Sequence, residues 1–107
     1  MKKRKVITMC GSLKFMEEII YHTERLELEG NCVLSIIYPT KDDKDAYEPA
    51  EHELLDELHK QKIDMSDAIF VVNVNGYVGS STRSEIEYAK EKGKEIMYLE
   101  KINIKSK

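Results

Sequence analysis

The chain has 107 residues, of which 41% are hydrophobic and 35% charged, enough for one domain with a core and a charged surface. With 17 Lys and Arg against 20 Asp and Glu, its net charge is −3, which excludes an overall basic surface for polymeric nucleic acid. Its apolar runs are too short to span a membrane. Two cysteines form neither a disulfide framework nor a CxxC zinc pair. We therefore expect a single cytoplasmic domain over residues 1–107.

The first third of the chain predicts a strand followed by a helix. Residues 5–10 are a short β-branched and apolar run that ends at Gly11-Ser12, as expected of a buried strand. A helix over 14–29 follows, with Ser12 as a candidate N-cap and Gly30 as its expected end. One stripe of this helix is apolar, at Met16, Ile19, Ile20, Thr23 and Leu26.

A second strand and a second helix are predicted in the middle of the chain. Residues 32–38 are apolar and end at Pro39, and the polar stretch 40–48 indicates an exposed loop. Pro49 suits the first turn of a helix. The apolar stripe expected to be buried consists of Leu54, Leu55, Leu58 and Met65, and the solvent side carries Glu51, Glu53, Asp56 and Glu57.

The last third opens with the clearest strand. Residues 68–74 are β-branched and uncharged, which is typical of a strand buried on both faces in a parallel sheet. In the loop 75–81, Asn75-Gly76 is a hairpin signal, but we reject a hairpin because the next two residues are too short a return strand. A helix, a strand and a polar tail complete the chain, at 82–92, 95–99 and 101–107.

The alternation of strands and helices predicts an α/β fold, a doubly wound parallel sheet of about four strands with helices on both faces. The simplest strand order is 2-1-3-4, with its switch point between the first and third strands. Ligands of such sheets bind there, outside the carboxyl ends of the strands. Two loops border this crevice, at residues 11–13 and 73–81.

Two segments of small residues lie at this crevice. Gly11-Ser12 opens a helix, where backbone N–H groups bind phosphate or sugar oxygens, although a turn with an N-cap is the simpler explanation. The chain has neither GxGxxG nor GxxxxGK[ST]. Thr82 and Glu85 have the spacing of a capping box, in which Thr82 caps the helix and Glu85 bonds back to its backbone N–H. From the spacing alone, this structural role is favoured for Glu85. The alternative is that Glu85 points into the crevice as a nucleophile or base.

The remaining candidates are single residues. His59 lies at the edge of an apolar stripe, where a lone histidine is more often a packing or surface residue. His52 is two helical turns away, too far to share a metal ion with it, so we expect no metal and no cofactor. Cys10 ends the first strand with no adjacent cation, and we expect it to pack rather than react.

Several segments together resemble the nucleoside 2-deoxyribosyltransferase-like family, which includes transferases and 5′-monophosphate N-glycosidases. They are Met9-Cys10-Gly11-Ser12, residues 66–72 and, most specifically, Ser-Thr-x-x-Glu-Ile-x-Tyr-Ala from Ser81 to Ala89. The resemblance covers nearly the whole chain in the right order. It implies a flavodoxin-like parallel sheet and a homodimer in which the partner subunit helps to close the site.

The resemblance also implies roles for individual residues. The glutamate that matches Glu85 is the nucleophile that attacks C1′ of the sugar, which divides one hard step into two. The serine that matches Ser12 contacts the sugar or its 5′-phosphate. The loop that matches residues 80–82, which carries three hydroxyl groups, also contacts this part of the substrate. The resemblance and the two loops that border the crevice together give the expected substrate-binding residues. These are Gly11, Ser12, Asn73, Gly79, Ser80, Ser81 and Thr82.

The chain departs from the family at one catalytic position. Many members carry an aspartate eight residues before the match to Asp67, where this chain has His59, whose ordinary pKa of about 6.5 suits proton donation. The expected function is cleavage or transfer at the N-glycosidic bond of a nucleoside or nucleoside 5′-monophosphate, with Glu85 and His59 as catalytic residues. The alternative is a non-catalytic module of the same fold that binds a nucleotide or senses a nucleotide-derived signal.

Overall fold

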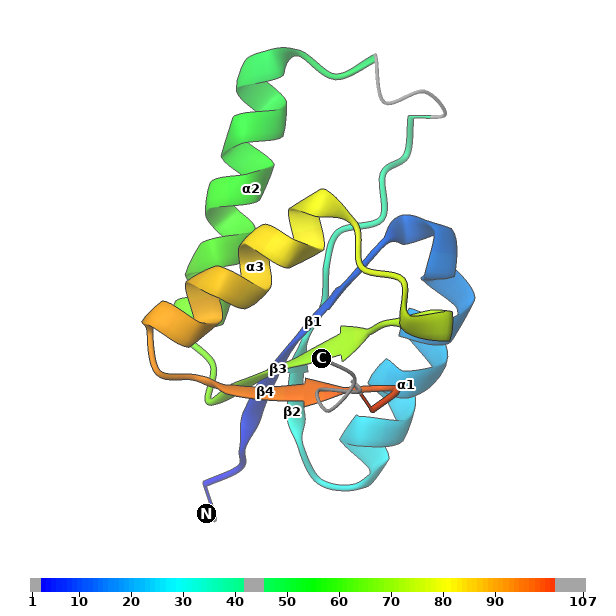
Figure 1. Ribbon diagram of the computed structural model, residues 1–107, viewed down its shortest axis with the longest axis vertical. Coiled ribbons are helices and arrows are strands. Elements are labelled where there is room, and N and C mark those ends of the chain that lie inside the picture. Colours follow the sequence, from blue (N-terminus) through cyan, green and yellow to red (C-terminus); the bar gives the residue numbers. More distant parts are fainter. Residues whose placement is uncertain (1–2, 42–45, 102–107) are drawn as a thin grey trace, which may run out of the picture.

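Four parallel strands form the sheet at the centre of the molecule (Figure 1). The structure is a computed structural model that describes residues 3–41 and 46–101. The strand order is β2-β1-β3-β4 and all neighbours are parallel, which confirms the predicted order and the flavodoxin-like α/β fold. The strands are β1 (Val6–Gly11), β2 (Cys32–Leu34), β3 (Ala68–Val72) and β4 (Glu95–Tyr98).

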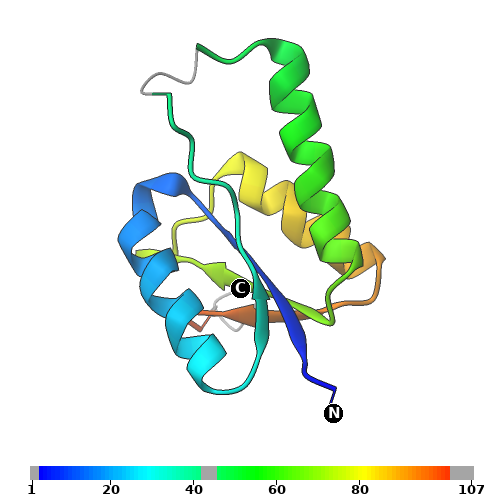
Figure 2. The same cartoon turned by 180° about the vertical axis from the view of Figure 1, so that it is seen from behind.

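Helices cover both faces of this sheet (Figures 1 and 2). One face packs against α1 (Met16–Leu28), and the other against α2 (Pro49–Asp64) and α3 (Ser80–Glu91). Short 3₁₀ turns follow the two central strands, η1 (Leu13–Phe15) after β1 and η3 (Val74–Gly76) after β3. None of the described helices is long and apolar enough to cross a membrane.

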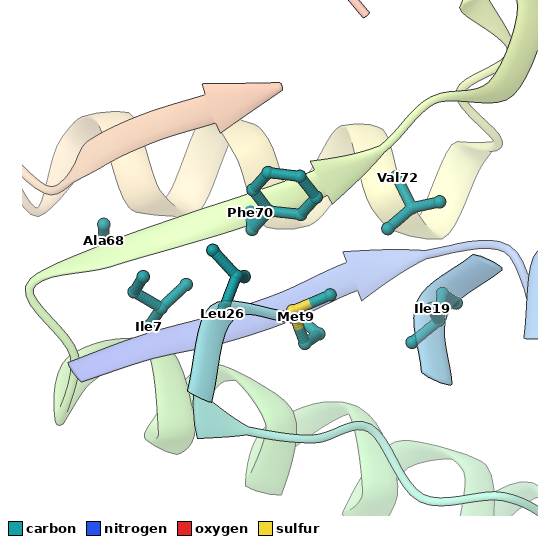
Figure 3. Close-up of a cluster of buried hydrophobic side chains, with 7 residues drawn as sticks. All are labelled: Ile7, Met9, Ile19, Leu26, Ala68, Phe70 and Val72. Atoms are coloured by element: carbon teal, nitrogen blue, oxygen red, sulfur yellow. The ribbon is translucent and has the colours of Figure 1, made fainter. Parts of the chain in front are cut away.

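The central strands send alternate side chains to two separate cores. Figure 3 shows the core on the α1 face, formed by Ile7, Met9, Ile19, Leu26, Ala68, Phe70 and Val72. The core on the other face consists of Cys10, Ile63, Ile69, Val71, Ile86 and Ala89. All residues of β3 are buried, as the uncharged run predicts. Because successive residues of a strand face opposite sides, Thr8 and Cys10 lie on the face of α2 and α3.

The predicted buried stripe of α2 is wrong. Leu54, Leu58 and Met65 are 52%, 43% and 60% exposed, whereas the buried residues of this helix are His59 and Ile63. The physical reason is the orientation of α2, whose side with His59 and Ile63 packs towards the sheet. At about 100° per residue, Leu54, Leu58 and Met65 lie together on a different side of the helix. The start of α2 also extends beyond the ends of the strands (Figure 1). His59 and Ile63, four residues apart, lie on one side of the helix.

The other sequence expectations differ from the structure mainly at element boundaries. The second strand ends at Leu34 rather than near residue 38. Both predicted glycine stops are present, since Gly30 and Gly93 follow helix ends with φ of +103° and +70°. Asn75-Gly76 lies in η3 rather than in a hairpin. Residues 42–45 of the predicted loop and 102–107 of the predicted tail lie outside the described residues.

Candidate functional site

A pocket of about 920 Å³ lies at the carboxyl ends of the strands, where the topology predicts a ligand site. Ligand pockets for small molecules commonly measure about 300–1,000 Å³. The loop after β1, the segment after β2, one side of α2 and the start of α3 line it. Its apolar side chains include Leu34, Ile36, Ile37, Leu55 and Leu58.

The structure brings together all but one of the residues predicted for this site. The predicted site residues that line the pocket are Gly11, Ser12, His59, Gly79, Ser80, Ser81, Thr82 and Glu85. Asn73 is the exception, because it is buried and is not among the lining residues. Its Nδ2 donates to the carbonyl of Glu100 at 3.0 Å, and its Oδ1 accepts from the Glu100 N–H at 2.9 Å. Asn73 therefore anchors the chain after β4.

The loop after β1 combines a close backbone approach with a polar rim. A Cβ atom on Gly11 would lie 3.2 Å from Cβ of Val72 and 3.3 Å from its carbonyl oxygen, so a larger residue would push the two central strands apart. Ser12 caps η1 rather than α1, since its Oγ accepts from the N–H of Lys14 at 3.3 Å. The ammonium of Lys14 lies 3.8 Å from the ring centroid of Tyr77, and both residues line the pocket.

The capping box expected from Thr82 and Glu85 is not formed. Helix α3 begins at Ser80 with Gly79 as its N-cap, so Thr82 is its third residue and Glu85 lies in its second turn. The carboxylate of Glu85 is thus too far along the helix to cap its first turn, and it lines the pocket instead. Glu48 and Glu51 form a capping box at the start of α2.

Three chemically active side chains from three different elements meet beside this pocket. Nε2 of His59 on α2 lies 3.6 Å from Sγ of Cys10 on β1 and 3.7 Å from Oε1 of Glu85 on α3. Cys10 is fully buried, and the side chains of His59 and Glu85 are 9% and 12% exposed. The ring of His59 also hydrogen-bonds to the backbone of Met9. We call these three residues the Cys10–His59–Glu85 cluster.

Burial favours the neutral form of every member of this cluster. It raises the pKa of Glu85 to about 7, although the hydrogen bond from Cys10 opposes the rise. It lowers the pKa of His59 to about 4, and the positive charge of Lys62 acts in the same direction. Burial, together with the nearby Glu85, raises the pKa of Cys10 well above its usual range. His59 is therefore uncharged at neutral pH, and its pKa lies below the ordinary value of about 6.5 on which the sequence analysis based proton donation.

Cys10 is the functional candidate that sequence reasoning missed. It packs in the core as predicted, but its thiol also contacts His59. The available signal was the alternation within β1, which places Cys10 on the same face as Thr8 at the end of the strand that borders the switch point. The expectation of no metal rested on the separation of His52 and His59, whereas the structure brings a different set of three groups together.

Comparison of this chain with protein-family models and with curated proteins finds no match. The resemblance to the nucleoside 2-deoxyribosyltransferase-like family accordingly rests on the motifs quoted above. A functional hypothesis for this protein depends on the geometry of the pocket and the chemistry of its side chains.

Proposed function

We propose that this protein cleaves or transfers at the N-glycosidic bond of a nucleoside or nucleoside 5′-monophosphate, with Glu85 as the nucleophile. The observation that carries the proposal is the position of the Glu85 carboxylate, which lines a pocket of nucleotide size and lies outside the helix cap that its spacing suggested. Apolar side chains on one wall suit a nucleobase, and the hydroxyls of Ser80, Ser81 and Thr82 suit a sugar.

The proposed reaction uses two residues of the cluster. The carboxylate of Glu85 attacks C1′, so that a C1′–O bond forms while the C1′–N bond to the nucleobase breaks. The proton comes from Glu85, whose raised pKa leaves it partly protonated: it passes to Nε2 of His59, 3.7 Å away, and from there to the departing nitrogen, which leaves Glu85 as the carboxylate that attacks. Water then attacks C1′ as the C1′–O bond to Glu85 breaks; the sugar leaves with the hydroxyl, and the proton of the water returns to Glu85. Attack by a second nucleobase in place of water would give transfer.

The rim of the pocket supports recognition of one phosphate group. The first turn of α3 lines it, and Gly79 provides no side chain to cap the free N–H groups there. Lys14 also lines the pocket, whereas Arg83 lies outside the lining and donates to the carbonyl of Val78 at 3.3 Å. The second lysine of the lining, Lys62, donates to the carbonyl of Ser35 at 2.8 Å. At the rim, Lys14 and a helix N-terminus would bind the phosphate, which suits a monophosphate better than a triphosphate.

We also propose that the protein is a cytoplasmic homodimer. Support comes from the apolar side chains of Leu54, Leu58 and Met65, which α2 leaves exposed. Leu58 and Met65 are also pocket-lining residues, so a partner subunit on this side of α2 would lie next to the site. Sedimentation at micromolar concentration tests this assembly, and a strict monomer would contradict it.

The decisive experiment incubates the protein with a panel of nucleosides and their 5′-monophosphates and measures the released nucleobase by chromatography. We expect turnover by the wild-type protein and a loss of at least about 10³-fold in Glu85→Gln, because that variant lacks the nucleophile. Glu87→Gln is the matched control, since Glu87 is exposed on the same helix. Full activity of Glu85→Gln would contradict the mechanism. Binding of a nucleotide without any base release would favour the non-catalytic module.

A further inference from the structure

The Cys10–His59–Glu85 cluster has the spacing of metal ligands. In a tetrahedral zinc site with bonds of about 2.3 Å to sulfur and about 2.0–2.1 Å to nitrogen and oxygen, neighbouring donor atoms lie about 3.3–3.6 Å apart. The corresponding distances here are 3.6 Å between Cys10 and His59 and 3.7 Å between His59 and Glu85. One donor atom from each residue lies within 4.8 Å of both others. Small side-chain adjustments would complete the geometry.

The surroundings of His59 resemble those of a metal-binding histidine. The ring of His59 hydrogen-bonds to the backbone of Met9, as metal-binding histidines bond to a neighbouring group, and its Nε2 faces Cys10 and Glu85. The end of α2 is held against β1 by Thr8, whose hydroxyl contacts Ser66 and donates to the carbonyl of Lys62 at 3.1 Å. The element that carries His59 is therefore fixed relative to the strand that carries Cys10.

We propose that Cys10, His59 and Glu85 bind a zinc ion at the inner end of the pocket. A thiolate, an imidazole and a carboxylate suit zinc, whereas magnesium and calcium prefer all-oxygen sites. Three protein ligands leave a fourth position, and it faces the pocket because His59 and Glu85 line it. Binding requires loss of the thiol proton, which passes to solvent.

This inference goes beyond the proposed function and stands without it. The two uses of Glu85 exclude each other, because a carboxylate that ligates zinc is not available to attack C1′. Where the proposed function holds, zinc would therefore inhibit base release. Binding of the metal itself is measured without any substrate, so the two proposals succeed or fail separately.

The test is titration of chelator-treated protein with Zn²⁺ by calorimetry and with Co²⁺ by visible absorption. We expect one ion per chain and a cobalt spectrum with a thiolate charge-transfer band. Loss of a group that merely supports a ligand weakens metal binding about 10–100-fold. Cys10→Ser should therefore weaken zinc binding by about 100-fold or more and abolish the band. Cys32→Ser is the matched control, because Cys32 is the exposed free cysteine.

The variants His59→Gln and Glu85→Gln provide independent evidence, since each removes one ligand from a different element. Each should also weaken zinc binding by about 100-fold or more, and His22→Gln, outside the pocket, should not. A cobalt spectrum without a thiolate band, or equal zinc affinity in wild-type protein and His59→Gln, would overturn the proposal. These two measurements decide it even if Cys10→Ser does not fold.

Discussion

The two faces of the sheet bury different kinds of side chain. Against α1 the buried residues of the core are all apolar (Figure 3). Against α2 and α3 the apolar core is joined by buried polar groups, Thr8, His59, Ser66 and Thr82, with Glu85 close to them. Among the described residues, no buried side-chain nitrogen or oxygen lacks a hydrogen-bond partner. The first face contributes mainly stability, and the second exchanges some apolar packing for polar groups beside a pocket.

The largest effect on stability should come from the apolar face. Ile19 is fully buried on α1, so Ile19→Ala should lower the free energy of unfolding by about 2–5 kcal/mol through lost burial and a cavity. Urea unfolding measures this loss. Ile20→Ala is the control on the same helix, because Ile20 is 51% exposed and its truncation should change stability by no more than about 0.5 kcal/mol. Equal losses in both variants would contradict the assignment of this face.

A smaller effect is expected on the polar face. Thr8→Val keeps the shape of the side chain but removes the hydroxyl that contacts Ser66 and the carbonyl of Lys62. Ser66 still donates to that carbonyl at 2.8 Å, so no group is left unpaired. We expect a loss of about 1 kcal/mol in the free energy of unfolding, measured by the same urea titration. A loss as large as that of Ile19→Ala would remove the distinction between the faces.

The apolar face and the topology were predictable from the sequence. Residues 68–74 carry no charge, and a strand buried on both faces needs none. The alternation of elements makes 2-1-3-4 the simplest strand order, and parallel strands of this order have one switch point, which places the pocket. Both inferences depend on patterns that can be seen within short stretches of the sequence, and the packing of the folded chain agrees with them.

The polar face was only partly predictable. Apolar periodicity assigned Leu54, Leu58 and Met65 to the buried side of α2. The side that packs towards the sheet instead carries His59 and Ile63. The motif from Ser81 to Ala89 identified Glu85, although spacing alone favoured a capping box at Thr82, whereas the N-cap of α3 is Gly79, three residues earlier. The meeting of Cys10 with His59 joins residues 49 positions apart, and no local pattern in one sequence predicts that contact.

The smallest predicted effect concerns ligand selectivity at the pocket rim. A nucleoside 5′-monophosphate should raise Tm more than the matching nucleoside or triphosphate, because only the monophosphate fits the rim formed by Ser12, Lys14 and the start of α3. At a concentration equal to Kd the stabilisation is about 0.4 kcal/mol. That corresponds to a shift of roughly 2–3 °C for a domain of this size, which thermal unfolding resolves.

The variant Ser12→Asp should abolish this preference, since it places a negative charge where the phosphate would bind. Ser84→Asp introduces the same charge at an exposed position of α3 outside the pocket lining, and it should keep the preference for the monophosphate. A wild-type protein stabilised equally by nucleoside and monophosphate, with no change in Ser12→Asp, would show that the rim binds no phosphate. The polar face would then recognise its ligand through the base and sugar alone.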